Sequence, residues 1–263
     1  MEYEPPTWGQ VGPDELRVIV AVSPHFDDAA MGAGQMLMRH ADTSRTVVIT
    51  VFGGRPPAYP NPPTQWDTLG GFRAGDDVVA ARRDEDRAAM AILGAEPLWL
   101  DFADHQYLQT DERPSASEVA SAILSAIDPI EPTAVFAPMG LANPDHVLAH
   151  DACLLVRQER PDCAWFAYED HGYKHLPGLL AWRVSALFHS GLWPTPAIVP
   201  LGLDLSRKRR AIGCYVSQIP PLERDHALTE RLDANVPEQF WRLAPPPQGW
   251  EFLSRSSPGD AGT

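Results

Sequence analysis

Short apolar runs alternate with longer stretches of helical periodicity from residue 16 to about residue 170. An apolar run of about four to eight residues, rich in β-branched and aromatic side chains, indicates a buried strand, whereas apolar residues three and four apart indicate an amphipathic helix. The five predicted strands cover residues 16–22, 45–52, 96–102, 133–139 and 163–169. The four predicted helices cover residues 29–41, 76–94, 115–128 and 145–158.

This alternation predicts an α/β fold with a Rossmann-like open sheet. Strands that are apolar on both faces need helices on both faces, and βα units with right-handed crossovers give a mostly parallel sheet. The alternation stops near residue 175. Residues 178–190 and 195–203 are predicted as later strands that are antiparallel at the sheet edge, and residues 205–218 and 221–233 as helices.

The segment from Gly53 to Gly75 follows the second predicted strand and has no periodicity. Structureless loops longer than about 12–15 residues are usually lids or binding loops when they occur inside compact domains. We therefore expect this loop to overhang a site. Its aromatic residues Tyr59, Trp66 and Phe72 either stack on a bound ligand or pin the loop to the body of the protein.

The chain of 263 residues is expected to form one domain over residues 1–253, followed by a disordered tail over residues 254–263. No apolar run approaches the roughly 18 residues that a membrane-spanning helix requires. The acidic, proline-containing N-terminus is unlike a secretory signal peptide, so a cytoplasmic location without membrane insertion is expected. A homo-oligomer is compatible with the sequence.

The formal net charge of −14 argues against nucleic acid as a partner, because nucleic-acid binding needs a basic surface. The first predicted strand is not followed by G-x-G-x-x-G, which disfavours a nucleotide-binding dehydrogenase. Neither nucleic acid nor a dinucleotide cofactor is therefore an expected partner.

Polar side chains or a long loop follow every one of the five predicted strands. In order along the chain they are His25, Asp27 and Asp28; the loop 53–75; Asp104 and His105; Asn143, Asp145, His146 and His150; and Tyr168, Glu169, Asp170 and His171. Open parallel sheets bind ligands outside the carboxyl ends of their strands. The convergence of these groups on one edge predicts a functional site there.

A metal ion explains the two adjacent aspartates after the first strand, because an unpaired pair of carboxylates in a cleft is costly. A histidine and one of the two carboxylates from this cluster, with a histidine from the fourth cluster, give a His₂Asp ligand set. Such a set leaves a position open for water and suits Zn²⁺, with Fe²⁺ or another divalent metal as a less specific match. The second aspartate would then lie within reach of that water.

Each of these residues also has a structural interpretation. Asp28 or Asp145 could cap the helix that it precedes, and His150 is expected to pack its helix. Four histidines carry no pattern and are interpreted as structural: His105, His175, His189 and His226.

Two motifs resemble those of the PIG-L/LmbE-like zinc deacetylases. "SPHFDD" resembles the P-H-x-D-D motif of this family, and "NPDH" resembles its H-x-D-H motif. Weaker matches in "RRDEDRAAMAILGA", "YED", "RKRRAIGCYVSQ" and "EQFWRL" extend the resemblance over residues 16–243.

The resemblance implies metal-dependent hydrolysis of an N-acyl group, usually N-acetyl, on an amino sugar. Carried over by position, the zinc ligands would be His25, Asp28 and His146, and Asp27 the general base. Asn143 and Asp145 would complete the catalytic group. The residues expected to contact substrate are Arg82, Asp104, Trp66 and His171.

One departure from the family pattern concerns the proton donor. Asn143 stands where the second motif usually has a histidine, and asparagine cannot shuttle a proton near neutrality. Either Asp27 serves as both base and acid, or another group such as His171 supplies the proton. Two further alternatives remain: an amidase that cleaves a larger amide conjugate, and a metal- or sugar-binding homologue with impaired catalysis.

Overall fold

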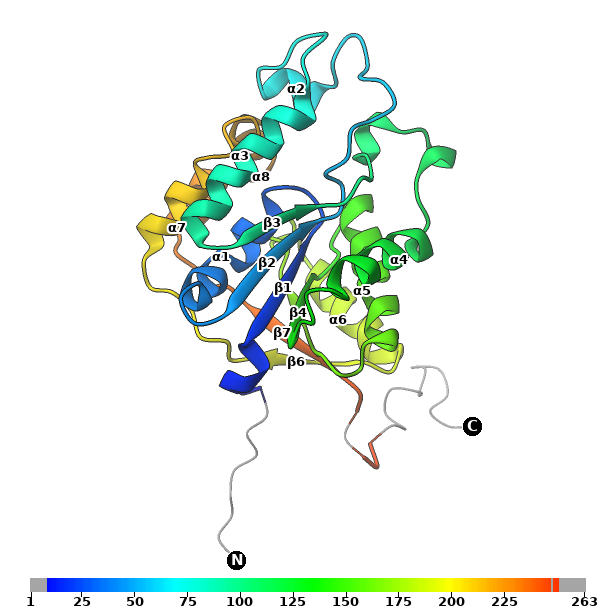
Figure 1. Ribbon diagram of the computed structural model, residues 1–263, viewed down its shortest axis with the longest axis vertical. Helices are drawn as coiled ribbons and strands as arrows, with labels where there is room; N and C mark the ends of the chain where they lie inside the picture. Colours follow the sequence, from blue (N-terminus) through cyan, green and yellow to red (C-terminus); the bar gives the residue numbers. More distant parts are fainter. Residues whose placement is uncertain (1–8, 247, 251–263) are drawn as a thin grey trace, which may run out of the picture.

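The computed structural model describes residues 9–246 and 248–250, and these form a seven-stranded sheet in the order β3-β2-β1-β4-β5-β7-β6 (Figure 1). The strands are β1 (Val18–Ser23), β2 (Arg45–Thr50), β3 (Glu96–Trp99), β4 (Ala134–Pro138), β5 (Ala164–Tyr168), β6 (Trp193–Ala197) and β7 (Phe240–Ala244). The first five are parallel, and β7 and β6 extend the sheet with antiparallel pairing. The prediction of a mostly parallel sheet with antiparallel edge strands is confirmed.

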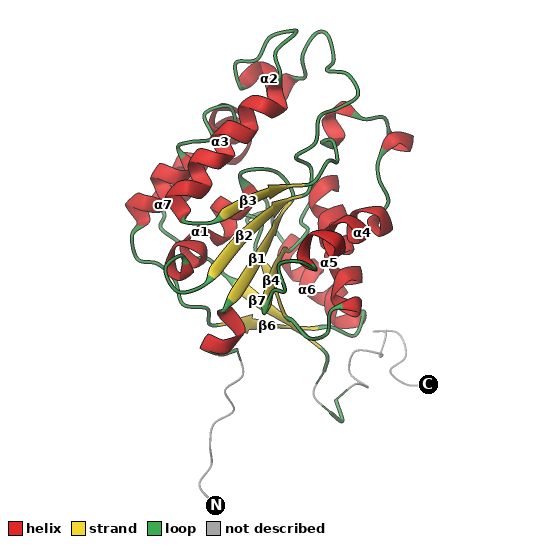
Figure 2. Ribbon diagram, viewed as in Figure 1, coloured by secondary structure: helices red, strands yellow, loops and turns green. Residues whose placement is uncertain are grey.

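Helices cover both faces of the sheet (Figure 2). They are α1 (Asp28–His40), α2 (Gln65–Leu69), α3 (Val78–Leu93), α4 (Ala116–Ile127), α5 (Pro144–Glu159), α6 (Leu179–His189), α7 (Leu205–Ile212), α8 (Ile219–His226) and α9 (Leu228–Asp233). One apolar cluster joins the sheet to α1, α3 and α7, and another joins it to α4, α5 and α6. No helix among the described residues is long and apolar enough to cross a bilayer.

The central strand β1 shows why its run of apolar residues is unbroken. Val20 and Val22 belong to the cluster under α4 and α5, whereas Ile19 and Ala21 belong to the cluster under α1 and α3. Successive side chains of a strand point to opposite faces, so a strand covered on both sides needs apolar residues at every position.

Gly32 lies inside α1 where that helix crosses β5. A Cβ atom at this position would lie 2.5 Å from the ring of Tyr168, which is fully buried. Close packing of the helix against the sheet therefore accounts for this glycine.

The prediction of a strand over residues 178–190 is wrong, because this segment is the helix α6. Leu180, Val184 and Leu187 follow one another at helical spacing, and Leu187 is buried. Trp182 lies on the solvent side and is 59% exposed, so an apolar residue on the outer face obscured the helical pattern.

Other boundaries in the C-terminal part also differ from the predictions, and the helix predicted over residues 205–218 ends at Ile212. The edge strand β6 ends at Ala197 rather than continuing to residue 203, and the strand β7 was not predicted. The helix predicted over residues 221–233 is two helices, because Ala227 between them has φ 48°. The predicted tail over residues 254–263 lies outside the described residues, and a single domain over residues 1–253 stays a prediction.

The order of the strands fixes where a ligand can bind. The chain moves from β1 outward to β2 and β3, and then returns to the other side of β1 with β4. At such a reversal the loops after the two central strands diverge and leave a crevice at their carboxyl ends. The loops after β1 and β4 carry the two motifs found in the sequence.

Candidate active site

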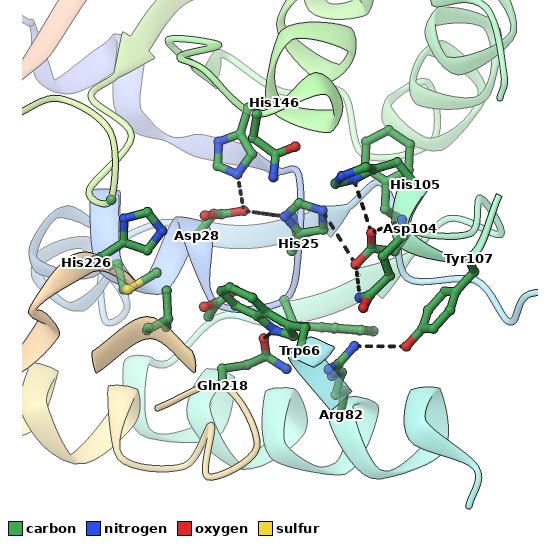
Figure 3. A pocket seen from close by; sticks show the side chains of 18 of the residues that line it. His25, Asp28, Trp66, Arg82, Asp104, His105, Tyr107, His146, Gln218 and His226 are labelled. Atoms are coloured by element: carbon green, nitrogen blue, oxygen red, sulfur yellow. Dashed lines mark hydrogen bonds and ion pairs between the residues drawn. The ribbon is translucent and has the colours of Figure 1, made fainter. Parts of the chain in front are cut away.

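A cavity of about 260 Å³ opens at the carboxyl ends of β1 and β4 (Figure 3). The loop after β1, the loop after β3, the start of α5 and the segment around α8 all contribute to its walls. Its polar wall comprises His25, Asp27, Asp28, Asp104, His105, Asn143 and His146. Its more apolar wall includes Met31, Trp66, Val79, Tyr173 and Leu222.

Asp28 joins the two motifs. Its Oδ2 accepts a hydrogen bond from the backbone N–H of His25 at 2.9 Å and lies 3.3 Å from His25 Nδ1 and 3.2 Å from His146 Nε2. In Figure 3 the three side chains point toward one another from the loop after β1 and from the first turn of α5. The predicted ligand residues are thus brought together.

These three donor atoms lie within 4.8 Å of one another. Two ligands at about 2.0–2.1 Å from a tetrahedral metal are roughly 3.3 Å apart, close to the separations observed around Asp28. Two imidazole nitrogens and one carboxylate without thiolate suit Zn²⁺ and similar divalent ions. The residues therefore fit a metal ion.

The chain turns sharply between β4 and α5 to present His146. Gly140 has φ 77° and Ala142 has φ 57°, both in the left-handed region. Asn143 then begins α5 as its N-cap, because its Oδ1 accepts a hydrogen bond from the backbone N–H of Asp145 at 2.8 Å. Capping is therefore a role of Asn143 and not of Asp145. The N-cap of α1 is Asp27 and not Asp28, and no capping bond from the Asp27 side chain is observed.

A buried carboxylate that the sequence did not assign holds His146 in place. Asp170 Oδ1 lies 2.8 Å from His146 Nδ1, and its Oδ2 accepts the backbone N–H of Leu141 at 2.9 Å. Metal-binding histidines usually bond a carboxylate through the other ring nitrogen, which fixes their orientation. The cluster after the fifth predicted strand contained this residue, but its side-chain direction could not be read from the sequence.

Burial and charge perturb the acids at this site in opposite directions. Burial, with the neighbouring charge of Asp28, raises the pKa of Asp27 to about 7. Burial also acts to raise the pKa of Asp28, but the charge and hydrogen bond of His146, together with His25, outweigh it and the pKa falls. Asp28 is therefore held as the carboxylate, and Asp27 is poised to accept a proton.

Asp145 connects His25 to a histidine that we expected to be structural. Asp145 Oδ2 lies 3.0 Å from His25 Nε2 and 3.0 Å from His105 Nδ1, and it also accepts the backbone N–H of His105 at 3.1 Å. His105 and Asp104 lie on the side of His25 opposite to Asp28 and His146 (Figure 3). His105, which we interpreted as structural, therefore lies at the site, and His226 also lines the cavity.

The structure does not bring His171 to the cavity. Asp170 faces His146, whereas the side chain of His171 lines a separate small cavity together with Lys174 and Lys208. Burial and the charges of these lysines lower the pKa of His171 to about 3. His171 does not line the cavity and its protonated form is disfavoured, so the structure does not support it as the proton donor.

Arg82 and Asp104 line the cavity as predicted from the sequence, but Arg82 is occupied by protein partners. It is 5% exposed, and it donates to Asp67 at 2.8 Å and to the hydroxyl of Tyr107 at 3.3 Å. The contact with Asp67 attaches the helix α2 to the helix α3, and the contact with Tyr107 attaches α3 to the segment after β3. Arg82 thus fixes the loop over the site.

A family model described as PIG-L, GlcNAc-PI de-N-acetylase, matches residues 20–156, slightly more than half of the 263-residue chain. The chain belongs to the PIG-L family. The matched span runs from β1 into α5 and contains both motifs that meet at Asp28.

Solved structures of deacetylases resemble this PIG-L protein. A deacetylase triple mutant from the teicoplanin biosynthetic pathway is 29% identical, with a TM-score of 0.71 over 88% of this chain and 99% of its own. The zinc-inhibited form of a teicoplanin deacetylase is 26% identical, with the same TM-score and coverage. An N,N'-diacetylchitobiose deacetylase from Pyrococcus horikoshii is 17% identical, with a TM-score of 0.54 over 94% of this chain and 89% of its own, and it shows the fold alone.

The loop 53–75 of this PIG-L protein carries the short helix α2, which extends beyond the carboxyl ends of the strands (Figure 1). Trp66 of α2 lines the cavity and donates from its indole N–H to Gln218 Oε1 at 2.8 Å. Tyr59 instead packs edge-on against Tyr107, and Phe72 lies under the guanidinium of Arg82. Tyr59 and Phe72 therefore attach the loop to the body of the protein.

Replacing Trp66 with alanine is expected to raise KM several-fold and to change kcat less. An aromatic ring on the cavity wall can stack on the C–H face of a sugar. Its removal weakens binding of the substrate and of the transition state by the same amount, which raises KM and leaves kcat nearly unchanged. Steady-state kinetics test this, with Trp182→Ala on α6, an exposed tryptophan far from the cavity, as the matched control. Unchanged kinetics for Trp66→Ala would leave Trp66 as a structural residue of the loop.

Proposed function

We propose that this PIG-L protein is a zinc-dependent deacetylase that removes the N-acetyl group of an amino sugar or amino-sugar conjugate. The observation that carries the proposal is the meeting of His25, Asp28 and His146 around one point of the cavity, with Asp27 beside them. The similarity to deacetylases of the teicoplanin pathway supports the reaction and the substrate class.

His25, Asp28 and His146 would hold the metal, with Asp170 orienting His146 from behind. When bound, the ion would polarise the amide carbonyl and acidify water. Asp27 would take the proton from the attacking water, because its carboxyl is buried beside the ligands and has a pKa near the working pH. Asn143 would donate from its amide to the developing oxyanion. Its Oδ1 is engaged by the helix cap, and its Nδ2 donates one hydrogen to the Tyr173 hydroxyl at 3.3 Å, which leaves the second hydrogen for the oxyanion.

The size and lining of the cavity suit a ligand that places one acylated sugar ring inside it. Its volume of about 260 Å³ is small beside the roughly 300–1,000 Å³ of sites that enclose drug-sized molecules. Polar groups on one wall suit the amide and the hydroxyls, and Trp66, Val79 and Leu222 suit the apolar face of a sugar. The complete set of metal-binding side chains and Asp27 argue against a homologue that has lost catalysis.

We expect the zinc-loaded protein to release free amine from N-acetylglucosamine derivatives, and a chelator to abolish the release. Fluorescent detection of primary amines across N-acetyl, N-butyryl and N-octanoyl glucosamines, with and without an aglycone, measures this. Restoration by added Zn²⁺ after dialysis separates metal loss from denaturation. The proposal fails if metal-loaded protein releases amine from none of these compounds, and preference for the longest chain would favour the amidase alternative.

A further inference from the structure

Cleavage of an amide requires a proton on the leaving nitrogen, since an amide anion is too basic to depart. Of the cavity-lining residues, those with ionisable side chains besides the three metal-binding residues are Asp27, Arg82, Asp104, His105, Tyr107, Tyr173 and His226. Arg82 never loses its proton near neutral pH. The donor must keep a proton near neutral pH and must be able to part with it.

Asp27 is already assigned to the proton of the attacking water, and most of the other groups do not meet that condition. Burial raises the pKa of Tyr173 to about 12 and that of Tyr107 further, so neither is acidic enough. Burial lowers the pKa of His226, which is therefore neutral. Asp104 is held as a carboxylate because its hydrogen bond to His105 and the charge of His25 outweigh the effect of burial.

His105 has the contacts expected of an acid. Its Nδ1 lies 3.0 Å from Asp145 Oδ2 and 3.2 Å from Asp104 Oδ1, and its backbone N–H donates to Asp145 as well. One ring nitrogen is therefore fixed by two carboxylates, which leaves Nε2 as the nitrogen available to a ligand. The ring is 27% exposed and lines the cavity, and one of its nitrogens lies within 4.8 Å of a nitrogen of His25.

We propose that His105, positioned by Asp145, is the general acid that protonates the leaving amine. The inference rests on the proposed deacetylase function. In this step the C–N bond of the tetrahedral intermediate breaks and its electron pair takes the proton from His105 Nε2. The products are the free amine and acetic acid, which then loses its proton to solvent. Asp27 has by then taken the proton of water, and both side chains return to their starting states by exchange with solvent.

The pH dependence follows from the groups that face His105. These are Asp104 on its own segment, Asp145 from α5 and His25 from the loop after β1. Hydrogen bonds with Asp104 and Asp145 raise the pKa of His105 to about 9 in the metal-free protein, more than burial lowers it, and a bound dication would lower this pKa. The protonated form is the active one, so kcat is expected to fall as the pH rises through this pKa.

The test compares His105→Gln with the wild type, each fully loaded with zinc. Glutamine keeps a hydrogen-bond donor for Asp145 but cannot transfer a proton, so kcat should fall about 10²-fold and the alkaline limb should disappear. His189→Gln, an exposed histidine on α6, is the matched control. Imidazole added to His105→Ala should restore part of the activity, which a merely structural role would not allow.

NMR of ¹⁵N-histidine-labelled, zinc-loaded protein provides a readout that does not depend on turnover. The His105 ring should stay protonated at pH 7, and Asp145→Asn should lower its pKa. A ring that is already neutral at pH 7, a His105→Gln variant that keeps the wild-type pH profile, or one that loses bound metal would each overturn the proposal. If the wild type itself released no amine, the proposed function would fail with it, whereas an active wild type and an equally active variant would reject His105 alone.

Discussion

Alanine in place of His146 is expected to release the bound metal and to lower activity roughly 10³-fold or more. The side chain supplies one of the three proposed donors, and the two that remain, from His25 and Asp28, would hold a divalent ion much less tightly. A metal contributes several kcal/mol of transition-state stabilisation, and each 1.36 kcal/mol is about tenfold in rate. Elemental analysis should find about one zinc per chain in the wild type and almost none in His146→Ala.

The control for this variant is His150→Ala, one turn further along α5. His150 is also fully buried, but its Nδ1 bonds the backbone oxygen of Pro138 at 2.8 Å and it does not line the cavity. Both variants remove a buried imidazole, so both should lose stability, yet only His146→Ala should lose the metal. Equal metal contents in the wild type and His146→Ala, after purification with zinc, would refute the proposed ligand set.

The parallel half of the fold could be predicted because burial on both faces leaves an unmistakable pattern. Strands such as β1 and β4 have no polar position between their ends, and the helices between them are long enough to show their period. The C-terminal part lacks this contrast. Trp182 places an apolar residue on the outer face of α6, and β7 is a five-residue strand that contains Arg242.

The three residues that meet in the cavity could be predicted because they are adjacent in sequence to the ends of central strands. His25 and Asp28 follow β1 directly, and His146 lies in the first turn of the helix after β4. Contacts between distant loops carry no such local signal. The bond of His105 to Asp145 and that of Asp170 to His146 depend on how three loops meet in space, which is why Asp170 was missed and His171, its neighbour, was assigned instead.

Asparagine in place of Asp27 is expected to keep the metal and the fold and to lower kcat by about 10²–10⁴, the usual contribution of a general base. Aspartate and asparagine side chains have nearly the same shape, and Asp27 is not one of the three residues of the proposed ligand set. The structural cost should be small, because no capping bond from the Asp27 side chain is observed.

The pH profile gives this prediction its sharpest test. The carboxylate form of Asp27 is the active one, so the rate of the wild type should rise with pH through the pKa of this group. Burial and the charge of Asp28 place that pKa at about 7 in the metal-free protein, and a bound dication would lower it. The acid limb should therefore lie at or below neutrality and be absent from Asp27→Asn. A metal-loaded Asp27→Asn enzyme with a near-wild-type rate, or with the same acid limb, would remove Asp27 from the mechanism and leave water activation to another group.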